Sequence, residues 1–533
     1  MVWAKVFPDF TPTERRNVAI YIMGIMGYKF ALENLSGCFS NIILQRVPQN
    51  PSTVWSTIVS VNFAAQSIGS LLVSPLMKRW PTSRVLSTAI ITFGLLVAIV
   101  PILEFFTGGG RDGTLTAGEK KYKFGQYDPM IVGYLFPVIG IFHGIIELVR
   151  RVIPKDIVGA DALKLKRMDG MVMVFYQIAG TSGALLSRVW IDKINYAYTL
   201  AIIPVVYLFV VAPIWSRIRN EEEKVAAINY KSQGAIREIG AIFRAFFRSV
   251  WIGAKLTLTN RSLVWLTFAY SVPFVIHRYK ENVLYAHYAN FGLSRGAYQQ
   301  QLIAGSNFGE LLGALLIVIY AITVPTPIPW QRLDALSLLT LWIYPLAAPW
   351  RENIEGWVWF LTLYNIPVSL GWSAGDCSLV AYIQSRLGSI ENVDSSISPL
   401  GAVMSFLYVF YIAVFATLSQ AIGRLQDSYV RDLRSKFGAP REWKNLIGLA
   451  PTQEAMMWSA GFVVSLACFL ILVSTFVPKG SFAWNPAVID SDEDLVEIKR
   501  QVAAHAARMT TRITRARRMP STTPFLCKER CCM

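Results

Sequence analysis

The sequence has few charged residues for its length. Asp, Glu, Lys and Arg make up 16% of the 533 residues and 53% are hydrophobic, whereas about 25% charged residues is typical of soluble proteins. A soluble chain of this length would divide into domains of about 100–200 residues joined by polar linkers. Apolar stretches of about 20 residues recur instead from one end to the other. The composition therefore indicates a protein whose solvent is lipid.

Patterns typical of enzymes and cofactor sites are also absent from the sequence. It contains no HExxH or GxSxG motif and no glycine-rich phosphate-binding loop. Its four His residues are scattered, and its six Cys residues show neither metal-ligand spacing nor a disulfide framework. We therefore predict that the protein is not an enzyme and binds no metal or cofactor. The N-terminal residues lack the pattern of a cleaved signal peptide, so the first span is predicted to direct membrane insertion.

The net charge is strongly positive, at +17. In a soluble protein this charge would suggest nucleic acid as a partner, but in a membrane protein Lys and Arg collect in the cytoplasmic loops. We interpret the charge in this second way and expect no nucleic-acid partner. Basic clusters follow the second span, at Lys78 and Arg79, and the fourth span, at Arg150 and Arg151. These loops and, with an even number of spans, both termini are predicted to be cytoplasmic.

Apolar windows long enough to cross a bilayer predict twelve spans in two groups of six. The first group covers residues 17–38, 54–76, 85–106, 130–150, 169–189 and 196–215, and the second covers residues 262–283, 298–323, 332–349, 356–384, 399–423 and 454–478. The predicted fold is an all-α membrane protein with about twelve transmembrane helices in two six-helix bundles. The predicted units are an N-terminal half (1–215), a linker (216–261), a C-terminal half (262–478) and a basic, disordered cytoplasmic tail (479–533).

The linker is predicted to contain a basic amphipathic helix on the membrane surface. At 100° per residue, one stripe of this helix is basic and the opposite side is apolar. The basic residues are Arg237, Arg244, Arg248 and Lys255, and the apolar ones are Ile239, Phe243, Phe246 and Val250. A calmodulin-binding helix would show the same pattern. In the tail, palmitoylation of Cys527, Cys531 and Cys532 is left open.

A short internal repeat links the two groups of spans. The run Gln66-Ser-Ile-Gly-Ser-Leu-Leu-Val in span two matches Glu310-Leu-Leu-Gly-Ala-Leu-Leu-Ile in span eight. Each run has a polar side chain, then Gly69 or Gly313, then an apolar stretch. Because the offset equals that between corresponding helices of two six-span halves, the match favours a parallel repeat.

The six-plus-six spans, the long central linker and the basic loop after span two together resemble the major facilitator superfamily over nearly the whole chain. In the signature of that loop, Gly69, Lys78 and Arg79 match, but Val73 replaces the acidic residue. Residues 153–187 resemble a poorly characterised fungal group of the superfamily. The resemblance implies a transporter that moves small solutes by rocking two helical bundles about a central site, usually driven by a gradient. It also implies that Gly69, Lys78 and Arg79 form a gating loop.

Ionisable side chains inside a span cost at least about 2.5–3.5 kcal/mol to insert, so each needs a partner, water or a function. Lys29 and Glu33 lie four residues apart on one face of span one. They either form an internal ion pair, or Lys29 attracts an anionic substrate or Glu33 binds a proton. In span four, Glu147 is predicted to pair with an arginine, and His143 either relays protons or forms a buried hydrogen bond.

Glu310 in span eight has no basic residue one turn away. It is predicted either to carry protons or to form a hydrogen bond, while protonated, with a neighbouring helix. Other polar or aromatic residues in the spans could line the same central site, although helix packing explains each of them equally well. These residues are Gln66, Gln177, Asn307, Trp372 and Asp376. His277 and Arg278 are expected toward the outer end of span seven.

We therefore predict a secondary transporter of a small organic solute that works by alternating access and is coupled to protons. Lys29 favours an anionic substrate, and the expected state is a monomer in the plasma or vacuolar membrane. The alternative is a membrane sensor or scaffold of the same fold that does not transport. The alternative stays open because the loop motif is incomplete and the C-terminal segment is long.

Overall fold

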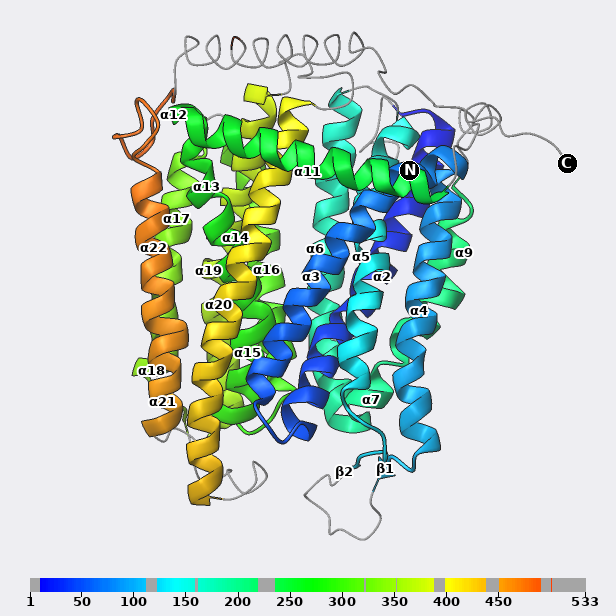
Figure 1. Ribbon diagram of the computed structural model, residues 1–533, viewed down its shortest axis with the longest axis vertical. Helices are drawn as coiled ribbons and strands as arrows, with labels where there is room; N and C mark the ends of the chain where they lie inside the picture. The colour runs from blue at the N-terminus through cyan, green and yellow to red at the C-terminus, as the bar shows by residue number, and fades with distance from the viewer. Residues whose placement is uncertain are drawn as a thin grey trace, which may run out of the picture.

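Helices that run side by side along the long axis form the body of the molecule (Figure 1). The computed structural model describes residues 10–111, 122–158, 162–218, 235–320, 323–350, 352–387, 398–437 and 450–489, together with residue 500. Within these ranges, twelve helical segments follow the long axis, and each overlaps one of the twelve predicted spans, although several extend beyond the predicted ends. The protein is an all-α membrane protein with two six-helix bundles.

The N-terminal half begins with five continuous helices and ends with a segmented one. Its helices are α2 (Pro12–Arg46), α3 (Pro51–Arg79), α4 (Thr82–Phe106), α5 (Ile131–Val158), α6 (Ala162–Ile194), and a sixth segment made of α7 (Tyr196–Thr199), α8 (Ile202–Val206), the π-helix η1 (Tyr207–Val211) and α9 (Ala212–Trp215). Between α4 and α5, β1 (Gly110–Arg111) pairs antiparallel with β2 (Tyr122–Lys123).

The C-terminal half begins with the most interrupted segment. This seventh segment consists of α12 (Arg261–Val264), α13 (Leu266–Ala269), α14 (Ser271–Tyr279), the π-helix η3 (Lys280–Leu284), α15 (Tyr285–His287) and the π-helix η4 (Tyr288–Gly292). The eighth segment is α16 (Tyr298–Tyr320), and the ninth consists of α17 (Ile328–Leu338), the 3-10 helix η5 (Leu339–Trp342) and α18 (Ile343–Leu346). The tenth is α19 (Ile354–Leu387) and the eleventh is α20 (Pro399–Phe437). The twelfth consists of α21 (Ala450–Met456), the π-helix η7 (Met457–Phe462) and α22 (Val463–Ser474).

Seven of the segments in the described part of the chain are long and apolar enough to cross a membrane by length and composition alone. The other five are α2, the seventh segment, α16, the α17–α18 segment and α19. These helices hold buried polar side chains near their middles, among them Glu33, His277 and Asn307. Polar groups at this depth are expected around a binding site in a transporter, because elsewhere they would face lipid.

The two halves repeat one helix crossing. A Cβ atom on Gly69 of α3 would lie 1.9 Å from the carbonyl oxygen of Ile141 in α5. One on Gly313 of α16 would lie 2.4 Å from the carbonyl oxygen of Leu370 in α19. Both crossings join the second and fourth segments of a half, and in both only glycine allows the backbones to come so close. The sequence repeat thus marks equivalent positions in the two bundles.

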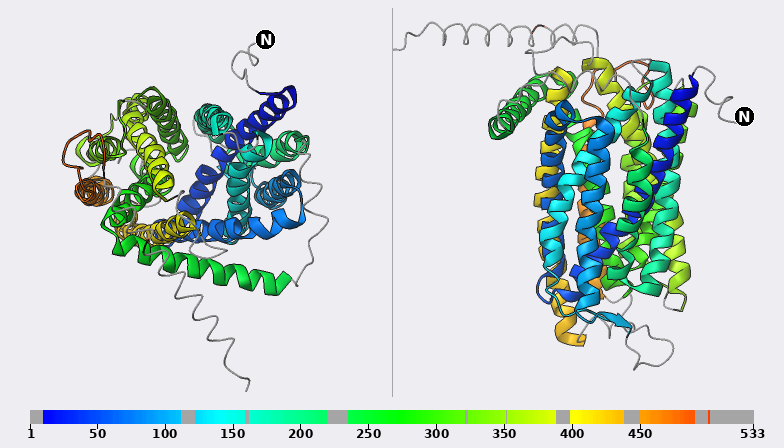
Figure 2. Two further views of the ribbon diagram at one scale, coloured as in Figure 1. Left: turned by 90° about the horizontal axis from the view of Figure 1, so that it is seen from above. Right: turned by 90° about the vertical axis from the view of Figure 1, so that its right-hand side faces the viewer.

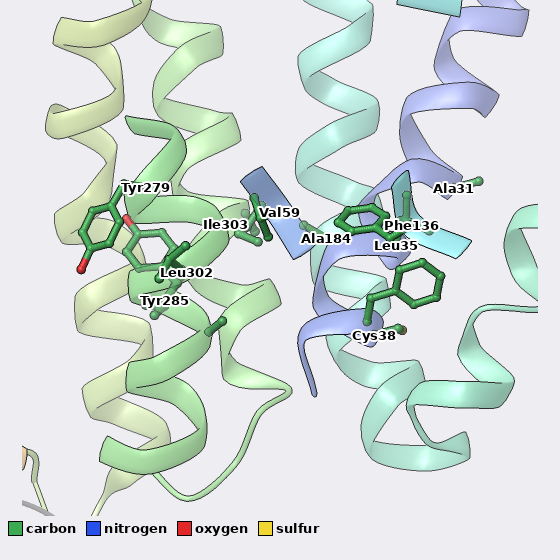
Figure 3. Packing of buried hydrophobic residues seen from close by; sticks show 14 of the residues in the cluster. Ala31, Leu35, Cys38, Val59, Phe136, Ala184, Tyr279, Tyr285, Leu302 and Ile303 are labelled. Carbon is green, nitrogen blue, oxygen red and sulfur yellow. The ribbon is translucent and has the colours of Figure 1, made fainter. Parts of the chain in front are cut away.

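The halves meet along α3 with α20 and along α6 with α16 (Figure 2). One continuous cluster of buried apolar side chains extends through both halves, and Figure 3 shows part of it, including Val59 and Ala184 from the first half and Ile303 from the second. Helix α2 packs along α6 and also contacts α16, so these three helices lie together where the halves meet.

Helix α11 (Ala235–Thr259) lies across one end of the bundle, which we call the α11 end (Figures 1 and 2). The opposite end, next to the two short strands, is the β1 end. A Cβ atom on Gly253 would lie 1.9 Å from the carbonyl oxygen of Ala402 in α20, and α11 also contacts α3. One helix of the linker therefore contacts both halves.

The side of α11 away from this contact is apolar and exposed. Phe247, Trp251 and Leu258 are 67%, 72% and 57% exposed, and at 100° per residue they share one narrow stripe. Arg244 and Lys255 are exposed beside that stripe. The side chains of the predicted stripe residues 237 and 239, and all residues from 501 to 533, including the three tail cysteines, lie outside the described residues.

A carboxylate from one half caps the N-terminus of a helix in the other half. Helix α3 begins after Asn50, which has a left-handed backbone (φ 49°) and is followed by proline. The backbone N–H groups of Ser52 and Thr53 both donate to the buried carboxylate of Asp427 in α20, at 2.8 Å each. A negative side chain at this position satisfies free N–H groups and complements the helix dipole. Asp427 therefore holds the start of α3 against the other half.

Candidate functional site

A hydrogen bond joins the two halves at the centre of the molecule. Gln177, near the middle of α6, donates from Nε2 to Oε2 of Glu310, near the middle of α16, at 2.5 Å. Gln177 is buried and Glu310 is half-buried. The structure therefore brings together two residues that the sequence analysis selected from different halves.

Lys29 and Glu33 of α2 lie beside this bond. They form an ion pair in which the side chains are 14% and 7% exposed, and Lys29 also interacts electrostatically with Glu310. A Cβ atom on Gly180 of α6 would lie 2.7 Å from Cε of Lys29 and 3.1 Å from Nδ2 of Asn307. Glycine at this position lets a cation from one half approach an amide from the other. We call Lys29, Glu33, Gln177, Asn307 and Glu310 the central site.

Tyr176 of α6 connects the central site to a second ion pair. Its ring lies 5.0 Å from Nζ of Lys29 and 4.7 Å from Cζ of Arg150 on α5, measured to the ring centroid. Arg150 in turn pairs with Glu147, at 2.6 Å. The sequence analysis missed Tyr176, because aromatic residues are frequent in this chain and nothing in its local sequence distinguishes it.

His143 and Glu147 lie on one face of α5, as their spacing predicts. Nε2 of His143 is 3.8 Å from Oε1 of Glu147, and the hydroxyl group of Tyr28 donates to the same oxygen at 3.0 Å. The ring of His143 also contacts Phe93 edge-on. The predicted Glu147–Arg150 pair is present. His143 has both a carboxylate and aromatic neighbours.

Arg278 of α14 contributes a third cation from the second half. Its side chain is 42% exposed, pairs with Glu281 at 3.5 Å and lies over the ring of Phe274 at 5.5 Å. It interacts electrostatically with Glu310. The expectation that His277 and Arg278 lie near the outer end of their span is wrong, because η3, α15 and η4 extend that segment to Gly292. Arg278 is therefore close to the middle of the segment.

Trp372 and Asp376 of α19 lie on the same side as Arg278. Trp372 is 7% exposed, contacts Phe274 edge-on and stacks on His277 with ring centroids 4.8 Å apart. Asp376, one turn further along α19, interacts electrostatically with Arg278 and with Arg151 of the other half. Both predicted residues are thus close to the centre, but Trp372 also covers a histidine behind it.

Gln66 is not brought to the central site. It donates to Oδ1 of Asn62 at 2.6 Å, and Asn62 donates to the backbone of Phe136 in α5, also at 2.6 Å. Gln66 therefore belongs to the contact between α3 and α5, as does Gly69. Of the predicted gating residues, Arg79 is the last residue of α3 at the α11 end, and the side chain at position 78 lies outside the described part.

Hydrogen bonds and ion pairs between the halves gather toward the β1 end. Arg188 and Asp192 of α6 pair with Glu355 and Arg295 of the second half. Further bonds join Ser36 to Asn282 at 3.1 Å, Ser40 to Gln299 at 2.7 Å, Gln45 to Asn290 at 3.1 Å and Trp55 to the backbone of Asn282 at 2.7 Å. The halves are therefore closed against each other at the β1 end.

A family model matches most of the chain. The model of the major facilitator superfamily matches residues 17–394. The chain belongs to the major facilitator superfamily. A search of the curated proteins finds no match. Within the described residues of this superfamily member, no group of three or more His, Cys, Asp or Glu could hold a metal ion.

Solved structures of other transporters share the fold. A D-xylose–proton symporter matches over 86% of this chain and 96% of its own, with 12% sequence identity and a TM-score of 0.53. A bacterial homologue of the human drug peptide transporters PepT1 and PepT2 matches over 86% and 97%, with 11% identity and a TM-score of 0.55. The nucleoside transporter NupG matches over 86% and 99%, with 12% identity and a TM-score of 0.51. At these identities the likeness concerns the fold alone.

Proposed function

We propose that this superfamily member is a secondary transporter that moves a small organic solute by alternating access, coupled to protons. The observation that carries the proposal is the hydrogen bond between Gln177 and Glu310. It joins the two halves at mid-depth, beside the charge of Lys29. A carboxylate in that position links its own protonation to the attraction between the halves.

The coupling follows from elementary electrostatics. Ionised Glu310 attracts Lys29 across the boundary between the halves, whereas protonated Glu310 is neutral and no longer does. Because charges at mid-membrane are costly, the loss of one proton must be compensated by a nearby cation or by a change in contacts. Binding and release of a proton at Glu310 therefore favour different arrangements of the two bundles, which is the requirement for gradient-driven transport.

The side chains around the centre support an anionic solute. Lys29, Arg150 and Arg278 each face the centre while paired with a carboxylate three or four residues away. The anionic group of a solute can take the place of a protein carboxylate beside one of these cations, and the ring of Tyr176 offers an apolar surface between two of them. The related symporter and peptide transporter structures make sugars and peptides the comparison substrates for a screen.

We propose that the α11 end is cytoplasmic, because Arg79 at the end of α3 and Lys164 near the start of α6 lie there. The closed β1 end then corresponds to an inward-facing state of a monomer. The plasma and vacuolar membranes remain the proposed locations. The resemblance of residues 153–187 to a fungal group supports a fungal origin.

The test begins with the purified protein and a thermal-shift screen against small organic acids, sugars and peptides. Compounds that stabilise the protein are then assayed for uptake into liposomes with and without a pH gradient. We expect Glu310→Gln to abolish gradient-driven uptake while leaving counterflow exchange intact. Asp432→Asn makes the same chemical change at an exposed position of α20 and should transport normally.

Full gradient-driven uptake by Glu310→Gln would contradict the proton assignment. Binding of a compound with no flux under any gradient would instead identify the protein as a sensor. These two outcomes separate the coupling proposal from the transport proposal.

A further inference from the structure

A second group of ionisable side chains lies inside the C-terminal half, behind the central site. His277 of α14, Lys280 of η3 and Asp334 of α17 are 1%, 0% and 1% exposed. Nε2 of His277 is 2.9 Å from Oδ1 of Asp334, and Lys280 donates from Nζ to the hydroxyl group of Ser369 in α19 at 2.9 Å. Lys280 also interacts electrostatically with Asp334.

Two of these groups, His277 and Asp334, have bonding capacity that the described residues do not use. Nδ1 of His277 and Oδ2 of Asp334 are buried and have no hydrogen-bond partner among those residues. Buried polar atoms in proteins nearly always have a partner, so two such atoms on one bonded pair require an explanation. Both atoms can accept a proton, and a site that gains and loses a proton must keep such positions available.

A row of ring contacts connects the buried pair to the centre of the molecule. Trp372 stacks on His277 and touches Phe274 edge-on. Phe274 lies under the guanidinium group of Arg278, whose side chain is 42% exposed. The row thus leads from His277 through Trp372 and Phe274 to Arg278, which interacts with Glu310 of the central site. Trp372 covers the face of the imidazole ring at the start of this row.

Charged and titratable groups lie near the pair on several of the helices around it. On its own segment they are Arg278, Lys280 and Glu281, on α16 Glu310, on α19 Asp376, and on α22 the thiol of Cys468. With Asp334 ionised, Lys280 charged and His277 neutral, the buried trio has no net charge. One added proton gives it a single positive charge. The other charges that act on His277 are the cations Lys280 and Arg278, so the carboxylate of Asp334, at 2.9 Å, is the group that compensates an extra proton on the ring.

We propose that His277 and Asp334, with Lys280 as their fixed neighbour, form a second proton-binding site that exchanges one proton with the central site when Trp372 moves aside. The imidazole ring accepts the proton, and its Nε2–H donates to the carboxylate of Asp334. The link of this site to transport rests on the proposed function. The protonation itself does not, because it needs no substrate.

Histidine NMR of the full-length protein in lipid nanodiscs tests the site directly. The chain has four His residues, so selective ¹⁵N labelling gives a spectrum in which His277→Gln assigns one signal. We expect a protonated fraction of His277 to become detectable as the pH is lowered from about 8 to about 5. Asp334→Asn should lower the protonated fraction at about pH 5 by roughly tenfold or more, because it removes the opposite charge.

Two variants serve as controls and separate this site from the coupling proposal. Trp372→Phe changes the ring stacked on His277, so it assigns the signal even if His277→Gln does not fold, and it should speed proton exchange at His277. Glu310→Gln should leave the titration of His277 in place. The proposal is overturned if His277 stays neutral across this pH range, or if Asp334→Asn leaves its protonation unchanged. Either result would leave the test of Glu310 unaffected.

Discussion

Single residues at the centre are arranged as charge pairs within one helix. Lys29 with Glu33 and Arg150 with Glu147 follow the three- and four-residue spacing that the sequence makes visible. Arg278 pairs with Glu281 at the same spacing, but the sequence analysis did not identify this pair and placed Arg278 toward a span end. In each pair the cation is neutralised locally yet still faces the other half. The pairs can therefore exchange partners without leaving a charge alone in the membrane.

A fourth pair, near the α11 end, predicts a pH dependence. Glu14 caps α2 together with Thr11 and accepts two hydrogen bonds from Lys164 of α6, at 2.9 Å each. Partial burial raises the pKa of Glu14, but the bonds from Lys164 and from the backbone of Thr11 outweigh it and hold the pKa below its usual 4.5. Stabilisation by this carboxylate is thus present above pH 4.5 and is lost as the pH falls through the lower pKa of the folded state.

Glu14→Gln isolates the charge, because glutamine preserves the capping box. We expect the variant to be less stable by up to about 1 kcal/mol near neutral pH and equal to the unchanged protein in acid. Thermal unfolding in detergent, measured across pH, checks this difference. A constant difference at every pH would show that the ion pair is not its cause.

At the scale of helices, α11 has three different sides. One packs on α20 through Gly253, one is the apolar stripe of Phe247, Trp251 and Leu258, and one carries Arg244 and Lys255. Apolar side chains next to basic ones, on a helix that lies across the bundle end, match the boundary between acyl chains and anionic headgroups. The helical spacing of basic and apolar residues was enough to predict this helix. Which of its sides packs against the bundle could not be predicted, because that depends on α20, which lies far away in the sequence.

Helix α11 is therefore expected to bind anionic lipids. In nanodiscs, hydrogen exchange of residues 235–259 should be slower with anionic than with neutral lipids. The double variant Arg244→Glu with Lys255→Glu should lose this difference, because each basic residue near an anionic surface contributes about 1 kcal/mol. Lys436→Glu, an exposed change near the β1 end of α20, should retain it. Equal exchange rates in both lipids for the unchanged protein would refute the expectation.

At the scale of the whole molecule, local sequence predicted the spans and their grouping but not how the halves meet. Hydropathy locates the membrane-embedded part of a helix, so α20 was predicted as 399–423 although it continues to Phe437. The bond between Gln177 and Glu310 and the contact of Trp372 with His277 join positions far apart in the chain. The spacing of residues within one helix carries no information about such pairs. The sequence therefore identified the polar residues as candidates for the site, but it could not predict which residues they contact.

The closed β1 end can be tested by a cross-link between the halves. The hydroxyl oxygens of Ser60 in α3 and Ser419 in α20 are 3.2 Å apart, which brings their Cβ atoms near the range that a disulfide requires. We expect the double variant Ser60→Cys with Ser419→Cys to form a disulfide on oxidation and to stop transport until it is reduced. Ser60→Cys alone should remain active. Continued transport by the fully oxidised double variant would show that this contact need not open.

The carboxylate of Asp427 has a consequence for how the protein is made. It lies 375 residues after Ser52, whose backbone N–H it accepts. At roughly 5–20 residues per second, a ribosome needs about 20–75 s to synthesise the chain between them. During that time the free backbone N–H groups in the first turn of α3 must donate their hydrogen bonds to water or to lipid headgroups. The cap that Asp427 provides at the start of α3 therefore forms only after most of the chain has been translated. A separately produced N-terminal half would lack this cap.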